Sequence, residues 1–113
     1  MKITIGKKTF DVVLFDNPTT TNFKKMLPLT LSMTELNGNE KYADLPHKIS
    51  ISPSNPGHIK AGDLMMYGST TIVLFYKSFQ TSYSYTPLGR IEDISGLEDA
   101  VGKRNVSVSF RLE

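Results

Sequence analysis

The sequence has 113 residues, of which 39% are hydrophobic, 21% charged and 10% aromatic, and it contains neither Cys nor Trp. The apolar content and a formal net charge of only +2 exclude a disordered chain. The absence of Cys excludes a disulfide scaffold and a Cys-ligated metal site. A chain of this length buries roughly two-thirds of its unfolded surface, so we expect residues 1–113 to form one domain.

The distribution of charge predicts neither a nucleic-acid partner nor insertion into a membrane. A nucleic-acid binder needs several cations that converge on one path, because affinity grows with the number of phosphates neutralised. Here the cations are scattered in separate pairs: Lys7–Lys8, Lys24–Lys25 and Lys103–Arg104. The longest apolar run, Ile72 to Tyr76, is far shorter than the roughly 20 residues of a membrane span.

The strand-like segment from Lys2 to Ile5 begins directly after Met1, with no signal-peptide pattern. That fits a cytoplasmic protein and equally an exported protein whose leader has been removed. The sequence therefore predicts no compartment, and it predicts no oligomeric state.

The first third of the chain predicts a strand, a short helix and a second strand. Apolar residues alternate with polar ones over 9–14 and again over 29–34, as in strands with one buried face. Between them, Asn17 provides a cap and Pro18 occupies the first helical position, where its missing N–H costs nothing. Pro28 prevents the helix from continuing.

Two dipeptides predict tight hairpins. Asn37-Gly38 favours a type I′ turn, and a two-residue loop there pairs Met33 with Tyr42 and Glu35 with Glu40. Gly68-Ser69 favours a type II′ turn between strands 63–67 and 70–77. A two-residue loop there pairs Met65 with Ile72 and Tyr67 with Thr70. These two strands are apolar on both faces, so we expect them to be central and covered on each side. The intervening segment, Pro46 to Gly62, is predicted to be a long ordered loop.

The last third predicts a second helix and a final strand. Ser95-Gly96-Leu97-Glu98 has the capping-box pattern, and Gly102 suits the position just after the helix. Alternation over 106–112 then predicts a strand. About eight short strands with two short helices favour a mainly β fold, a closed barrel with the helices as caps.

Motifs along nearly the whole chain resemble the small bacterial cyclophilin-like family. They are Asp16-Asn17-Pro18-Thr19, the segments 26–33 (MLPLTLSM) and 36–42 (LNGNEKY), the segment 56–68 (PGHIKAGDLMMYG) followed by 72–77 (IVLFYK), Leu88-Gly89-Arg90-Ile91 and Gly96-Leu97-Glu98. The resemblance implies a closed eight-stranded antiparallel cyclophilin-like β-barrel with two short capping helices.

The resemblance supports the fold more strongly than it supports isomerase activity. Cyclophilin-type peptidyl-prolyl isomerases use an Arg beside a Phe-x-x-Gln stretch, and their pocket usually contains a Trp. No such stretch follows Arg90, Arg104 or Arg111, and Trp is absent. No catalytic residue can be assigned by motif, and fold alone does not establish the activity.

Aromatic residues after the central strands predict a ligand-binding groove on the barrel. Segment 79–85 interleaves aromatic rings with hydroxyl groups, a combination typical of ligand pockets and also of a packed edge strand. The predicted contacts, which should face solvent together, are Met33, Tyr42, Tyr67, Phe79 and Tyr83 for apolar groups, with Glu40 and Gln80 for polar groups.

Two further groups of residues are weaker candidates for a functional site. Glu35 opposite Glu40 would place like charges across a strand pair, which raises one pKa and is one route to acid–base chemistry. His47 and His58 lack the spacing of metal ligands, so we expect neither a metal nor another cofactor. The favoured function is binding of a peptide or small molecule. The alternative is a weak peptidyl-prolyl cis-trans isomerase with a non-standard active site.

Overall fold

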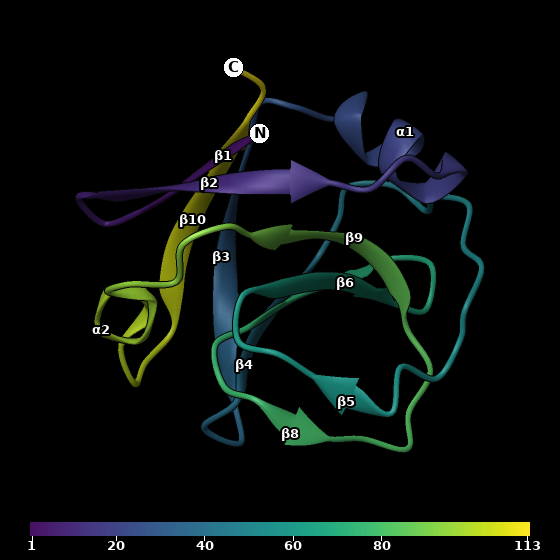
Figure 1. Cartoon of the computed structure of the whole chain (residues 1–113). Coiled ribbons are helices and arrows are strands. Elements are labelled where there is room, and N and C mark those ends of the chain that lie inside the picture. The colour runs from purple at the N-terminus through teal and green to yellow at the C-terminus, as the bar shows by residue number, and fades with distance from the viewer.

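Eight antiparallel strands close into a barrel in the computed structural model, which describes all residues from 1 to 113 (Figure 1). The order of neighbouring strands around the barrel is β1-β10-β3-β4-β7-β6-β9-β2. The bounds of these strands are β1 Lys2–Ile5, β2 Lys8–Leu14, β3 Leu29–Leu36, β4 Glu40–Asp44, β6 Asp63–Tyr67, β7 Thr71–Phe75, β9 Thr86–Ile91 and β10 Val106–Arg111. The predicted closed barrel is confirmed.

Two short helices complete the barrel, α1 (Pro18–Lys24) and α2 (Leu97–Val101). The Asn17 side chain caps α1 as predicted, because its Oδ1 accepts a 2.8 Å hydrogen bond from the Thr20 amide. The capping box predicted at Ser95 is wrong: Gly96 is the cap of α2, and no side chain bonds the helix end. The Ser95 amide instead donates to Asp93 Oδ1, which closes a local turn before the helix. Neither helix has the length and apolar character that crossing a membrane requires.

The barrel interior forms one cluster of 19 buried apolar residues. Both helices contribute to it, α1 with Phe23 and α2 with Leu97 and Val101. The ring of Phe23 meets Phe110 of β10 edge to face, with centroids 5.8 Å apart. The helices are therefore part of the core, as expected for caps.

A small second sheet lies outside the barrel. It pairs β5 (His58–Ile59) with β8 (Phe79–Gln80), and Ser54 forms an isolated bridge to Tyr85. The segment predicted as a long loop thus contains a strand. Figure 1 shows β5 and β8 side by side, and the apolar contacts of Ile59 and Phe79 place this sheet on β6 and β7.

Both predicted hairpin registers are wrong by one residue. Tyr42 lies opposite Thr34 instead of Met33, and Tyr67 lies opposite Thr71 instead of Thr70. Asn37 and Gly38 have the positive φ values of a type I′ turn, but Asn39 is an additional loop residue. Its amide donates to Leu36 O at 3.1 Å, which closes the loop, and its carbonyl accepts from the Tyr76 amide at 2.9 Å, just after β7.

Candidate functional site

The outer faces of β4, β6 and β7 carry a second apolar layer. Because successive strand residues point to opposite faces, β7 directs Leu74 inward and Val73 and Phe75 outward. Five buried residues form this outer cluster: Ile59, Met65, Val73, Phe75 and Tyr85. The prediction that the strands expected at 63–67 and 70–77 are covered on both faces is confirmed for β6 and β7, apart from Tyr67 at the end of β6, which is 50% exposed.

A groove of about 380 Å³ opens at the edge of this layer, which we call the tyrosine groove. Its size suits a side chain or a small molecule. It is lined by nine residues: Leu36, Asn37, Glu40, Tyr42, Tyr67, Thr71, Val73, Tyr83 and Tyr85.

The tyrosine rings of the groove form a connected aromatic set. Tyr67 lies 5.6 Å from Tyr85 and 6.2 Å from Tyr83, measured between ring centroids. Tyr85 is buried and packs edge to face on Phe75, whereas Tyr67 and Tyr83 are 50% and 62% exposed. A buried ring thus supports two rings that remain open to solvent, and their uncovered apolar area is available for a ligand.

Glu40 is the only charged residue of the groove. It begins β4 opposite Phe75 and is half-buried, and its carboxylate has neither a hydrogen-bond partner nor an ion-pair partner in the chain. Burial raises the pKa of Glu40, and the negative charge of nearby Glu35 adds to this effect. The groove therefore combines aromatic faces with one unpaired acid.

Four of the predicted contacts meet in the groove: Glu40, Tyr42, Tyr67 and Tyr83. Met33 does not, because its side chain points into the barrel interior, where it is fully buried. Phe79 packs on Phe75 with centroids 5.7 Å apart, and Gln80 is exposed opposite His58 in the small sheet. These three residues lie outside the groove. Tyr85 lies in the segment 79–85 that the sequence singled out, but it was not among the predicted contacts.

The predicted Glu35–Glu40 pair is wrong, since Glu35 lies opposite Lys41. A slip of one residue turns every side chain to the other face of a strand. Lys41 is therefore fully buried, and its Nζ donates to Glu35 Oε1 at 3.0 Å, Gly102 O at 2.9 Å and Arg104 O at 2.6 Å. Three acceptors match the three donors of an ammonium group. This network ties β4 to the loop between α2 and β10.

Tyr76 completes the network by donating a hydrogen bond from its hydroxyl to Glu35. Burial and this hydrogen bond raise the pKa of Tyr76. Desolvation tends to raise the pKa of Glu35, but hydrogen bonds from Tyr76, the Gly38 amide and Lys41 outweigh it and keep the pKa low. The charges here are satisfied within the protein, so the network is structural.

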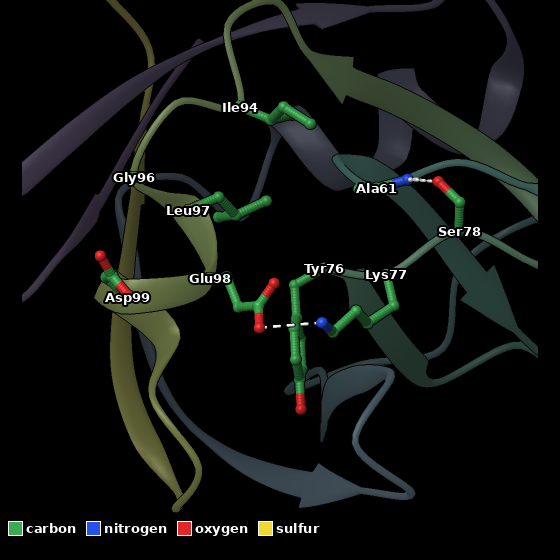
Figure 2. A pocket seen from close by; sticks show the side chains of 9 residues that line it. All are labelled: Ala61, Tyr76, Lys77, Ser78, Ile94, Gly96, Leu97, Glu98 and Asp99. Atoms are coloured by element: carbon green, nitrogen blue, oxygen red, sulfur yellow. Dashed lines mark hydrogen bonds and ion pairs between the residues drawn. The ribbon is translucent and has the colours of Figure 1, made fainter.

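A larger cavity of about 530 Å³ lies between α2 and the end of β7 (Figure 2). Two of its three charged residues are paired with each other: Lys77 Nζ bonds Glu98 Oε2 at 2.8 Å across the opening. Ile94 and Leu97 point into this space, and Asp99 points away from it (Figure 2). No aromatic cluster comparable with that of the tyrosine groove lines it.

Metal binding has no support in the arrangement of side chains. No group of three or more His, Asp or Glu residues is placed to hold an ion. His47 and His58 are both exposed.

A closed eight-stranded antiparallel barrel, capped by two short helices and carrying a groove on its outer face, defines a cyclophilin-like domain. The family model described as the cyclophilin-like family matches residues 3–113, and the chain belongs to that family. No curated protein and no solved structure matches the chain. The resemblance drawn from the sequence motifs is confirmed.

Replacing Glu40 by Gln is expected to stabilise the fold near pH 7 and to leave it unchanged near pH 3. The raised pKa means that folded Glu40 binds its proton more tightly than the unfolded chain does, whose ordinary value is 4.5. The ionised carboxylate therefore lowers the free energy of unfolding above the folded pKa, and this penalty disappears below the unfolded pKa. Urea unfolding of both proteins at the two pH values checks this. A lower midpoint for Glu40→Gln near pH 7 would contradict it.

Proposed function

We propose that this domain binds a peptide or small-molecule ligand in the tyrosine groove. The observation that carries the proposal is the pair of exposed rings, Tyr67 and Tyr83, standing over buried Tyr85 beside an unpaired carboxylate. Ligand pockets commonly combine aromatic walls with a few polar groups that fix orientation. Exposed rings contribute little to folding, so their grouping is better explained by contact with a ligand.

The isomerase alternative gains no specific support from the groove. Cyclophilin-type isomerases hydrogen-bond the rotating amide with an arginine, and none of the nine lining residues is an arginine, although tyrosine and threonine hydroxyls are present. Asn37 is the only lining residue with a side-chain amide donor, and it is exposed in the β3–β4 loop. We therefore place binding ahead of turnover.

The proposal is tested by nuclear magnetic resonance on the ¹⁵N-labelled protein with a panel of blocked amino acids and a proline-containing tetrapeptide. We expect at least one compound to shift the amide signals of Tyr42, Tyr67 and Tyr83 in a saturable way. Shifts confined to the Lys77–Glu98 cavity, or no shift with any compound, would refute the proposal. A coupled isomerisation assay on the same tetrapeptide separates the two functions, because turnover lost in Tyr42→Ala would favour the isomerase.

Removing both exposed rings, as Tyr67→Ala with Tyr83→Ala, should weaken such binding at least tenfold. Each aromatic contact contributes about 0.5–1.5 kcal/mol beyond its buried area, so two contribute about 1–3 kcal/mol, and the lost apolar contact area brings the total above the roughly 1.4 kcal/mol of a tenfold change. Unfolding should change by only about 1 kcal/mol, because both rings are at least half exposed. Leu112→Ala is the matched control, since it removes a side chain that is 49% exposed outside the groove. Equal binding by the double variant and this control would contradict the prediction.

A further inference from the structure

The charge of the tyrosine groove restricts which ligand it accepts. Its one charged residue is Glu40, and no Lys, Arg or His lines it. The cation nearest in sequence, Lys41, is turned to the opposite face of β4 and is held by Glu35 and two carbonyls. None of the four ion pairs of the protein includes Glu40.

An anionic ligand would meet repulsion from Glu40, whose charge no cation of the chain balances. A neutral ligand would cover the Glu40 carboxylate and leave it without a partner, which costs free energy. A cation avoids both costs, because it pairs with the carboxylate as it enters. The charge of the groove alone therefore favours a cationic ligand over a neutral or an anionic one.

The tyrosine faces add a second attraction for the same kind of ligand. A cation within about 6 Å of an aromatic face is attracted by the ring quadrupole, and the attraction grows when the site excludes water. Tyr42, Tyr67, Tyr83 and Tyr85 all line the groove that Glu40 enters. A ring of aromatic side chains with one carboxylate is suited to an ammonium group on an apolar stem, with the stem against the rings and the charge at Glu40.

We propose that the tyrosine groove binds an alkylammonium group, such as the end of a lysine side chain or of a free alkylamine. This inference rests on the proposed function and names the chemical class of its ligand. Glu40 is the residue that determines specificity, and the tyrosines are its aromatic walls. The volume of about 380 Å³ holds one such group with its stem.

The test compares blocked amino acids with unbranched side chains that end in a cation, an uncharged methyl group or an anion. The probes are N-acetyl-lysine methylamide, its uncharged counterpart N-acetyl-norleucine methylamide, and the anionic N-acetyl-glutamate methylamide, with cadaverine as the free amine. Affinities are measured by nuclear magnetic resonance titration at low salt near pH 7. We expect the lysine derivative to bind at least about fivefold more tightly than the norleucine derivative, and the glutamate derivative to bind most weakly.

Glu40→Gln should reduce the preference for the lysine derivative over the norleucine derivative, leaving only the part that the tyrosine faces supply. Glu98→Gln is the matched control, because it removes a carboxylate that already pairs with Lys77 outside the groove. A fold defect cannot explain the loss, since Glu40→Gln is expected to be the more stable protein near pH 7. Comparison of cadaverine with the lysine derivative distinguishes a free amine from a peptide side chain as the source of the ammonium group.

The outcomes separate the two proposals. If the norleucine derivative shifts the groove signals as strongly as the lysine derivative, the inference fails and the proposed function stands. If Glu40→Gln keeps the full preference for the cation, the inference fails as well. If none of the probes and no compound of the wider panel shifts the groove signals, both the proposed function and the inference fail.

Discussion

Replacing Lys41 by Met should lower the free energy of unfolding by about 3–4 kcal/mol, the size of loss measured when one partner of a buried ion pair is removed. Lys41 is 0% exposed, and its ammonium satisfies Glu35 and the carbonyls of Gly102 and Arg104. Met fills a similar volume without donating a hydrogen bond, so the variant leaves three acceptors and one negative charge uncompensated. Urea unfolding monitored by circular dichroism gives the value.

Lys77→Met provides the matched control for this prediction. Lys77 pairs with Glu98 at 2.8 Å, but both side chains are well exposed, at 44% and 62%. Exposed pairs contribute at most about 1 kcal/mol, because water screens them. If Lys41→Met costs no more than Lys77→Met, the network does not tie the α2–β10 loop to the barrel as we describe.

Replacing Phe23 by Ala should cost about 3–5 kcal/mol, the range for a large aromatic side chain removed from a core. Phe23 is 0% exposed and packs against Phe110 inside the barrel, although it belongs to a helix of only seven residues. A helix this short is not stable by itself, so its burial in the barrel holds it in place. The variant should therefore lose α1 as an ordered cap as well as stability.

Phe15→Ala tests whether position in the core, and not aromatic content, determines that loss. Phe15 lies just after β2 and is 36% exposed. We expect its removal to cost about 1 kcal/mol. Hydrogen exchange on the Phe23→Ala protein should show reduced protection in 18–24 relative to the Phe15→Ala protein. Equal stability losses would show that α1 is not a structural cap.

The sequence predicted the barrel well because period-two alternation and turn residues are local signals. Residues 29–34 and 106–112 alternate strictly, and residues 9–14 alternate apart from Val13; each segment contains a strand with one more buried face. Asn17-Pro18 likewise begins α1 where the cap pattern places it. These features depend on residues within one element, so they can be predicted from a single sequence.

The register of strand pairing was harder to predict from the sequence, because it depends on contacts between strands. The turn dipeptide Asn37-Gly38 was found, but the additional loop residue Asn39 was not, since its carbonyl bonds the amide of Tyr76, which lies just after β7 and is distant in sequence. That one residue turns Glu35 toward Lys41 and separates it from Glu40. The groove itself joins β4, β6 and the segment after β8, which are distant in sequence, so only part of its lining was predicted.

The central claim, that the tyrosine groove is the ligand-binding site, is tested most directly by crystals of the protein grown with N-acetyl-lysine methylamide and, separately, with the wider panel. We predict electron density for a ligand between Tyr67 and Tyr83, with the ammonium group of the lysine derivative beside Glu40. Ligand density only in the Lys77–Glu98 cavity, or an empty groove with every compound that binds in solution, would contradict the claim.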